Sequence, residues 1–165
     1  MAVYFTSDLH LGHRNIHKYR TGFNSTEEND KYILDLICAL GKRDILIVLG
    51  DFLFDSTYFN DYLNHIETKA RCLIKVIMGN HDSKLLYNLP TTSRISVELP
   101  FYSYKNMWLS HCPIHPQEMR GRIGNLHGHL HEEVINDPKY FNVNIDVNNY
   151  QFVKLDTIKE YFNGN

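Results

Sequence analysis

Three apolar runs of strand length, each ending directly in polar residues, constrain the fold of this chain most. They cover residues 2–6, 44–49 and 72–78 and are rich in β-branched and aromatic side chains. The polar residues that follow them are Asp8 and His10, then Asp51, then Asn80, His81 and Asp82. Open α/β sheets place their sites at the carboxyl ends of the strands, so we expect these residues to meet at one sheet edge.

The two segments between these runs are expected to be amphipathic helices. Ser25 to Glu28 fits a capping box, and apolar residues follow at helical spacing until Gly41. Thr57 is the expected N-cap of a second helix, whose apolar face includes Ile66. The order strand, helix, strand, helix, strand is typical of a parallel sheet with helical crossovers.

From about residue 94 the pattern changes to short strands joined by turns. The expected strands are residues 94–99, 101–110, 123–127, 141–147 and 152–155. Asp156 is the expected cap of a closing helix that ends at Phe162. Two further polar clusters follow strands in this half: His111, and then His129 and His131. The predicted architecture is an α/β fold of two packed sheets flanked by helices, with the clusters at one edge.

The composition limits the classes of protein to which this chain can belong. With 165 residues, 43% hydrophobic and 22% charged, the chain suits one globular domain over residues 1–165. A formal charge of −2 gives no strong indication of nucleic-acid binding. Because no apolar run approaches transmembrane length, we expect no membrane contact and a cytoplasmic location. Cys38, Cys72 and Cys112 are odd in number and lack CxxC spacing, so they are expected to be reduced, buried thiols.

The polar clusters are best interpreted together as metal ligands. Each histidine alone would be interpreted as a surface or hydrogen-bonded residue, but seven oxygen or imidazole donors at strand ends favour a metal site. Asp8 and His10 can converge only if the chain turns between them. Carboxylate, amide and imidazole donors without thiolate suit Mn²⁺ best, with Fe, Zn²⁺ or Ni²⁺ as alternatives. The number of donors exceeds the need of one ion, so two divalent ions sharing one carboxylate are expected.

These motifs, in this order, resemble those of the calcineurin-like metallophosphoesterases, in particular the small single-domain bacterial and phage type. They are Asp8-x-His10, Gly50-Asp51, Gly79-Asn80-His81-Asp82, His111 and Gly128-His129-x-His131. The resemblance spans nearly the whole chain, and residues 144–155 also resemble the ending of the small members. It implies a four-layer αββα sandwich of two mixed β-sheets flanked by helices, with the metal site at the C-terminal ends of the strands.

The resemblance also implies a role for each motif residue. One metal ion would be bound by Asp8, His10 and His131, and the other by Asn80, His111 and His129. Asp51 would bridge the two ions, together with a hydroxide that acts as the nucleophile. His81 would contact the scissile phosphate as a catalytic and substrate-binding residue, and Asp82 would support His81.

Four further residues lie near the motifs, and two of them have more than one interpretation. Arg14 is a candidate for binding a substrate phosphate, and the alternative is a solvated loop arginine. His127 is either a neighbour of the ligands or a strand residue, and no role is assigned to His13. Cys112 is expected to be a small buried side chain.

Departures from larger relatives narrow the substrate. Asp51 is followed by Phe-Leu-Phe-Asp-Ser, and His81 by Asp82, unlike the motifs of the Ser/Thr protein phosphatases in the superfamily. Repair nucleases of the superfamily add a capping domain that grips DNA, and we expect no room for one in this chain. The stretch between Asp82 and His111 is also short, so the site should be open to small phosphate esters. A phosphodiesterase acting on nucleotide-like substrates is the leading interpretation. A phosphomonoesterase on the same site and a non-catalytic metal-binding scaffold are the alternatives, and the oligomeric state stays open.

Overall fold

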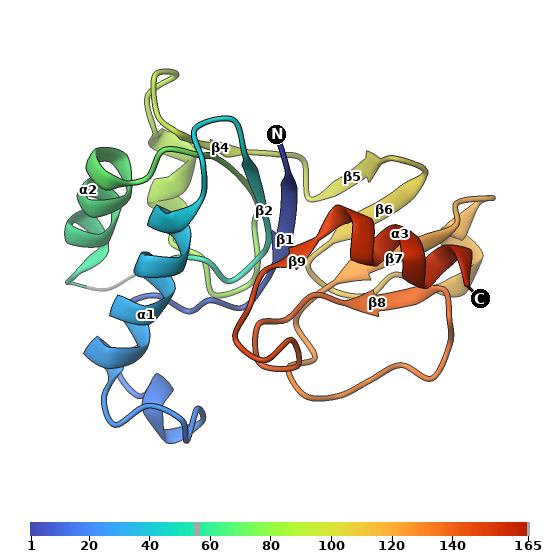
Figure 1. Cartoon of the computed structure of the whole chain (residues 1–165), viewed down its shortest axis with the longest axis horizontal. Helices are drawn as coiled ribbons and strands as arrows, with labels where there is room; N and C mark the ends of the chain where they lie inside the picture. The colour runs from blue at the N-terminus through green and yellow to red at the C-terminus, as the bar shows by residue number, and fades with distance from the viewer. Residues whose placement is uncertain (55–56, 165) are drawn as a thin grey trace.

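The structure, a computed structural model, describes residues 1–54 and 57–164, and these form two β-sheets with three α-helices (Figure 1). The strands are β1 (Val3–Thr6), β2 (Ile45–Leu49), β3 (Leu73–Ile77), β4 (Ile95–Val97), β5 (Phe101–Tyr104), β6 (Met107–Ser110), β7 (Gly124–His127), β8 (Tyr140–Asn142) and β9 (Val153–Lys154). The α-helices are α1 (Thr26–Ala39), α2 (Phe59–Lys69) and α3 (Leu155–Asn163). Short 3₁₀ helices are η1 (Ile16–Lys18), η2 (Lys84–Asn88) and η3 (Pro116–Met119).

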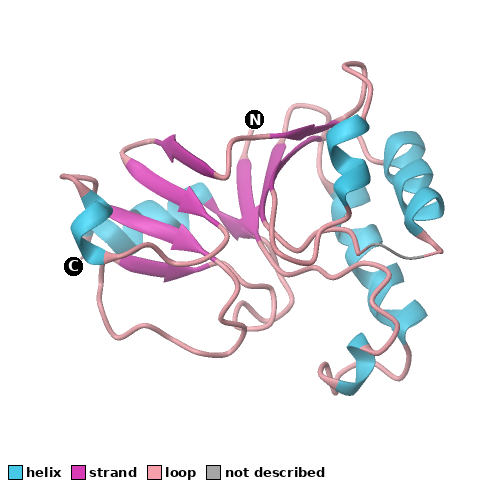
Figure 2. Cartoon of the chain, turned by 180° about the vertical axis from the view of Figure 1, so that it is seen from behind, coloured by secondary structure: helices cyan, strands magenta, loops and turns pink. Residues whose placement is uncertain are grey.

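The five-stranded sheet has the order β4-β3-β2-β1-β9. Strands β1 to β4 are parallel, and β9 pairs antiparallel with β1, so the sheet is mixed. Helix α1 connects β1 to β2, and α2 connects β2 to β3, so the expected strand–helix alternation is confirmed. Both helices lie beside this sheet, as the two opposite views show (Figures 1 and 2).

Strand β2 shows why the apolar runs contain so few polar positions. Leu46 and Val48 pack in the core between this sheet and helices α1 and α2. Ile47 and Leu49 point to the opposite face and join a second core, which includes Leu126 of the other sheet. Successive side chains of a strand face opposite sides, so a sheet covered on both faces needs a continuous apolar run.

The four-stranded sheet has the order β5-β6-β7-β8 and mixes antiparallel and parallel pairs. Helix α3 packs on this sheet, where Tyr161 lies edge-to-face on Phe141 and its hydroxyl donates to the Tyr140 carbonyl at 3.1 Å. The layers are therefore α1 with α2, the two sheets, and α3. This confirms the predicted αββα sandwich of two mixed sheets.

Three local predictions needed correction. Residues 101–110 form a hairpin instead of one strand, because Lys105 and Asn106 both adopt positive φ and turn the chain. The N-cap of α2 is Tyr58 and not Thr57, and the N-cap of α3 is Lys154 and not Asp156. Neither cap residue makes a side-chain capping bond, so packing of the apolar helix faces decides where these helices begin.

The capping box of α1 is confirmed in part. The Ser25 hydroxyl accepts the backbone N–H of Glu28 at 3.2 Å, as expected for an N-cap. The Glu28 carboxylate, however, accepts from the backbone N–H of Asn24 at 2.7 Å. The reciprocal bond is therefore made one residue before the cap.

The expected strand 141–147 is shorter in the structure, since β8 ends at Asn142. The Asn142 side chain accepts the backbone N–H of Asn144, and the Asn144 side chain accepts that of Asp146, at 2.9 and 2.8 Å. Such bonds to the backbone two residues on build turns and compete with strand pairing. They bend the chain towards the polar clusters.

The cysteines agree only in part with the expectation of reduced, buried thiols. All three thiols are free; Cys72 is buried and Cys38 partly so, but Cys112 is exposed, and its predicted burial was wrong. Cys112 lies past the end of β6, where the chain has left the sheet and its core.

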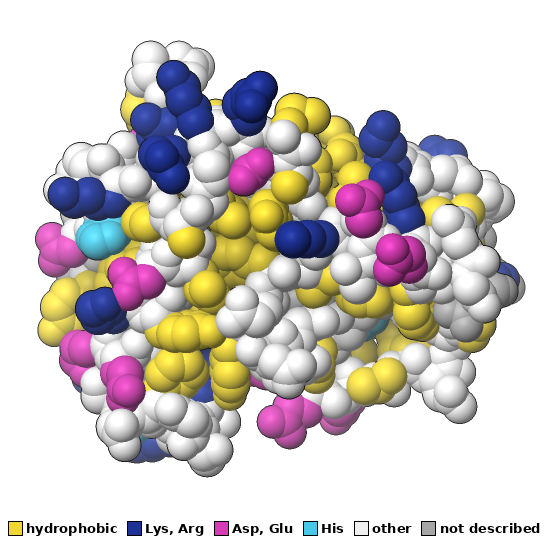
Figure 3. Space-filling view, in the orientation of Figure 1, with side chains coloured by type: hydrophobic (Ala, Val, Ile, Leu, Met, Phe, Trp, Pro, Cys, Tyr) yellow, Lys and Arg dark blue, Asp and Glu magenta, His cyan; other side chains and the backbone are white. Residues whose placement is uncertain are grey.

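Acidic and basic side chains are interspersed on the face in Figure 3. Among the described residues, no helix is long and apolar enough to cross a membrane.

Candidate metal centre

The polar clusters follow the C-terminal ends of five strands: β1, β2 and β3 in one sheet, and β6 and β7 in the other. Backbone hydrogen bonds join the loops that carry them. The N–H of Asp8 donates to Gly50, and the N–H of His10 donates to Asp51, both at 2.9 Å. In the other sheet Gly128 donates to His111, also at 2.9 Å. Within each sheet, hydrogen bonds therefore hold neighbouring loops together: those after β1 and β2, and those after β6 and β7.

The backbone turns sharply at most of the donor residues. Asp8 and His10 have φ of 57° and 51°, so the turn that these two residues required is present. Asp51, His129 and His131 also have positive φ, between 49° and 69°. Non-glycine residues rarely adopt this region, and such strain gathers at functional sites. The strained backbone directs these side chains to a common point.

The motif glycines make room for the donors. A Cβ atom at Gly79 would overlap the Asp51 carboxylate, and one at Gly128 would overlap Ser7 and the Asp8 carboxylate. Gly50 combines a φ of +87° with close contact to the His111 ring. The glycines of the motifs are therefore required by contact with the donor side chains.

One group of donors consists of Asp8, His10 and His131, whose ligand atoms all lie within 4.8 Å of one another. The Nε2 atoms of His10 and His131 are each 4.0 Å from Asp8 Oδ1. Burial raises the pKa of Asp8. A nearby cation would favour the carboxylate and offset this effect.

A second group lies beside the first. His111 Nε2 is 3.0 Å from Asn80 Oδ1 and 3.2 Å from His129 Nδ1. Asp51 Oδ2 lies between the groups, at 3.7 Å from His10 Nε2 and 3.5 Å from His111 Nε2. The structure thus brings together all seven residues that the sequence singled out as metal ligands.

The imidazoles fit divalent ions. His10 is only 5% exposed, and neither of its ring nitrogens has a hydrogen-bond partner among the described residues. Burial and the nearby Arg20 guanidinium lower the pKa of His10 to about 2, so the ring is neutral. His111 Nδ1 lies 2.8 Å from the Leu49 carbonyl, an arrangement that leaves Nε2 as the acceptor nitrogen. Neutral imidazoles with a free, inward-facing nitrogen are suited to binding divalent ions.

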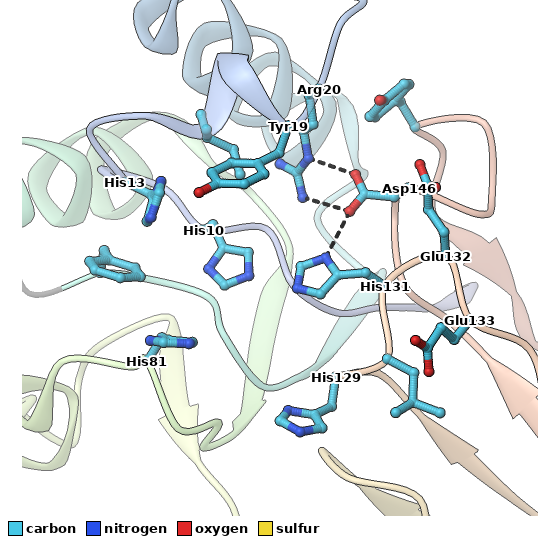
Figure 4. Close-up of a pocket in the computed structure, with 14 residues that line it drawn as sticks. His10, His13, Tyr19, Arg20, His81, His129, His131, Glu132, Glu133 and Asp146 are labelled. Atoms are coloured by element: carbon cyan, nitrogen blue, oxygen red, sulfur yellow. Dashed lines mark hydrogen bonds and ion pairs between the residues drawn. The ribbon is translucent and has the colours of Figure 1, made fainter.

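Arg20 and Asp146 also take part in this site, and the sequence analysis missed both. Arg20 is 1% exposed, donates to the carbonyls of Asp8 and Leu9, and pairs with Asp146 at 2.6 Å (Figure 4). Asp146 Oδ2 lies 3.2 Å from His131 Nδ1. This hydrogen bond raises the pKa of His131 and orients its ring with Nε2 towards Asp8. The resemblance of residues 144–155 to the ending of the small family members was the sequence indication that included Asp146.

His81 and Asp82 occupy different positions. The exposed His81 ring stacks on Phe54 with centroids 5.4 Å apart, and it lies 5.7 Å from the His10 ring. The backbone N–H of His81 donates to Asp51 Oδ1 at 2.9 Å. Asp82 accepts four backbone N–H groups, from Gly79, Asp51, Phe52 and Leu53, at 2.6 to 2.9 Å. Asp82 therefore fixes the loop backbone that carries His81, instead of contacting its ring.

Two neighbouring cavities lie in this part of the molecule, and donor residues line the first. The first, of about 780 Å³, is lined by His10, His81, His129, His131, Arg20 and Asp146, among others. The second, of about 850 Å³, is lined by residues 12–15 and by residues of α1 and α2, and it shares His13 and Phe54 with the first. Arg14 is exposed and lines the second cavity, not the first. The structure therefore separates Arg14 from the other candidate site residues.

The remaining candidates near the ligands are His127 and Cys112. His127 is buried at the end of β7, where its Nδ1 contacts the Gly128 carbonyl at 2.9 Å. This places it among the strand residues. The exposed Cys112 thiol lies within 4.8 Å of ligand nitrogens of His111 and His129, so a sulfur atom adjoins a donor set that was expected to lack one.

Comparisons with known proteins agree with this geometry. A sequence model of the calcineurin-like phosphoesterases matches residues 1–162. The Gene 66 protein of Mycobacterium phage D29 is 28% identical, over 98% of this chain and 96% of its own length. An uncharacterized protein of Methanocaldococcus jannaschii is also 28% identical, over 94% of this chain and 88% of its own length.

One solved structure shares the fold. The crystal structure of a protein of unknown function from Aquifex aeolicus matches with a TM-score of 0.71, over 96% of this chain and 98% of that one. Its sequence identity is 22%, so the similarity concerns the fold alone.

Proposed function

The chain belongs to the calcineurin-like phosphoesterase family, whose members hydrolyse phosphate esters with divalent metal ions, and from this premise we propose a two-metal phosphodiesterase acting on nucleotide-like esters. The metal-dependent hydrolysis follows from the family. The number of ions, the residue roles and the preference for diesters are the proposal.

The two donor groups support two ions. Asp8, His10 and His131 would hold one, Asn80, His111 and His129 the other, and Asp51 would contact both from its intermediate position. Such ions supply a nucleophile from water and neutralise charge on the reacting phosphate. Mn²⁺ is the preferred metal for this mixture of oxygen and imidazole donors. The three free thiols accord with a reducing, cytoplasmic location, which is also part of the proposal.

His81 is the proposed catalytic acid. It lines the first cavity, and no described donor group includes it, so its ring nitrogens are available to a substrate. The bond from its backbone to Asp51 and the stack on Phe54 fix its position beside the proposed bridging carboxylate. From there the imidazole would bind the phosphate and give a proton to the leaving oxygen. Asp82 would act as a positioning residue through the backbone.

The charge of the residues that line the first cavity supports a preference for diester substrates. Arg20 is the one Lys or Arg among the described residues that line it, and its guanidinium is already paired with Asp146. Glu132 and Glu133 line the same cavity and are exposed. A phosphate monoester carries about two negative charges near neutral pH, as a protein-bound phosphate does, whereas a diester carries one. Apart from the proposed metal ions, the described lining has no free Lys or Arg to offset these carboxylates, so they disfavour the more highly charged ester. Arg14, in the second cavity, is suited to a more distant part of a long substrate.

The experiment compares bis-p-nitrophenyl phosphate with p-nitrophenyl phosphate as substrates in Mn²⁺. We expect kcat/KM for the diester to equal or exceed that for the monoester. Replacing Glu132 and Glu133 together by glutamine should raise the monoester rate relative to the diester by about threefold, the effect of a modest change in surface charge. Glu160→Gln, on the exposed side of α3, is the matched control. A strong preference of the unmodified protein for the monoester would establish the phosphomonoesterase alternative instead.

A further inference from the structure

The mouth of the first cavity carries an aromatic side chain that the hydrolysis itself does not use. Tyr19 lines this cavity, yet its side chain is 75% exposed (Figure 4). Large aromatic side chains are exposed at such sites when their apolar faces serve recognition. Tyr19 is therefore available to a ligand that reaches the metal donors.

The backbone beneath Tyr19 is held firmly. Its N–H and that of Arg20 both donate to the Ile16 carbonyl at 3.0 Å, which closes η1. The next side chain, Arg20, is buried and bonded to Asp146 and to Asn29 of α1. The Tyr19 ring also lies edge-to-face on His13, with centroids 6.2 Å apart. An exposed ring on a fixed backbone loses little conformational entropy when it binds, because only its own rotamers are restricted.

The rest of the lining indicates the chemistry of the ligand. Ile16 and Tyr150 line the same cavity as Tyr19 and add apolar surface to it, while Glu132 and Glu133 belong to the loop after His131. In Figure 4 Tyr19 and the two glutamates lie on different sides of the histidines. Carboxylates accept hydrogen bonds from hydroxyl and amino groups. A group that stacks on an aromatic ring and also donates hydrogen bonds to carboxylates matches both features.

The size of the cavity agrees with such a group. About 780 Å³ lies within the range of sites that enclose ligands as large as a drug molecule. A methyl or other small alkyl ester would leave Tyr19 uncovered. A nucleoside has a base that can stack and sugar hydroxyls that can donate, joined to the phosphate that the metal centre would bind.

We propose that Tyr19 forms the stacking platform of a nucleoside subsite, so that the substrate is a nucleoside 5′-phosphodiester with its base on this ring. This inference rests on the proposed diesterase and names its substrate class. Tyr19 then determines specificity and has no part in breaking the bond.

The test compares two diesters with the same p-nitrophenolate leaving group, the adenosine 5′-ester and the methyl ester of p-nitrophenyl phosphate. The Mn²⁺-loaded protein should prefer the adenosine ester in kcat/KM. In Tyr19→Ala this preference should fall roughly tenfold, which is the loss expected for one base stacked on an aromatic side chain. The change should lie in KM, since stacking is equal in ground and transition states.

Two control variants isolate the ring. Tyr19→Phe keeps the aromatic face and should retain most of the preference. Tyr87→Ala removes a tyrosine that is 64% exposed on η2, away from the lining of both cavities, and should retain all of it. An unchanged preference in Tyr19→Ala, or an equal loss on both esters, would overturn the subsite.

Calorimetric binding of adenosine 5′-methylphosphonate separates this inference from the proposed function. If neither diester is hydrolysed, the diesterase proposal fails. Binding of the phosphonate that weakens roughly tenfold in Tyr19→Ala would still support the subsite. Equal binding by both proteins would reject it.

Discussion

The two neighbouring cavities share the wall formed by His13 and Phe54, yet their buried polar groups differ. In the first, both ring nitrogens of the buried His10 lack a hydrogen-bond partner among the described residues. In the second, the buried Asp30 carboxylate accepts from the Gly12 N–H at 3.0 Å and the Tyr62 hydroxyl at 2.6 Å. A buried polar group costs free energy when unsatisfied, so His10 indicates a ligand and Asp30 indicates a structural contact.

The two cavities also differ in the backbone strain of the residues near them. Five of the seven proposed ligands have positive φ, whereas α1 and α2, which border the second cavity, are regular helices. Changes in the first cavity should therefore affect metal binding and turnover more than folding. Changes in the second cavity should affect folding more than metal binding and turnover.

The largest effect is expected for Asp51→Asn. The protein should bind about two divalent ions per chain, and the variant should bind both at least 10²-fold more weakly, since even residues behind the ligands contribute 10- to 100-fold. Asparagine keeps an oxygen for the His81 N–H, so the loop should stay in place. Metal analysis after dialysis measures the effect, with Asp61→Asn of the second cavity as control. A single tight ion that survives the change would contradict the two-metal proposal.

The second-largest effect is expected for His81→Ala. Its turnover should fall by roughly 10²- to 10⁴-fold, the range for losing a positioned proton donor, while metal content stays the same. Because p-nitrophenolate needs little protonation, the loss should be larger for an ester with an alkyl or ribose leaving group.

The control for this change is His65→Ala, which alters an exposed histidine of the second cavity. Steady-state kinetics on both kinds of ester separates the possible outcomes. Equal losses would mean that His81 stabilises phosphate charge instead of donating a proton. Full turnover on both would mean that His81 has no catalytic role.

The smallest effect on activity is expected for Tyr62→Phe. This change removes the hydroxyl that donates to Asp30, so the free energy of unfolding should fall by about 1.5 kcal/mol, the contribution of a hydrogen bond to a charged group. Denaturant unfolding measures this loss, with Tyr87→Phe on the exposed η2 as control. The kcat/KM should stay within about twofold, because Asp30 contacts none of the proposed ligands. A large loss of activity with unchanged stability would show that the second cavity takes part in the reaction.

Sequence reasoning found the donors because each follows a strong local signal. Asp8, Asp51 and Asn80 come directly after apolar runs, and parallel strands bring their carboxyl ends to one edge. The same reasoning missed Arg20, whose partner Asp146 is 126 residues away along the chain. An arginine after a short loop and an aspartate in a turn carry no local pattern that would join them.

The sequence by itself determined the order of strands and helices, two packed sheets and the residues gathered at their edge, since apolar periodicity and motif spacing act over a few residues. The mixed character of the sheets was implied by the family resemblance. Tertiary structure alone decided that Arg14 borders the second cavity, that Cys112 is exposed beside the donors, and that Asp82 binds loop backbone. It also left Tyr19 exposed while the next residue, Arg20, is buried. These features depend on where separate loops meet, and that position is set by packing across the whole molecule.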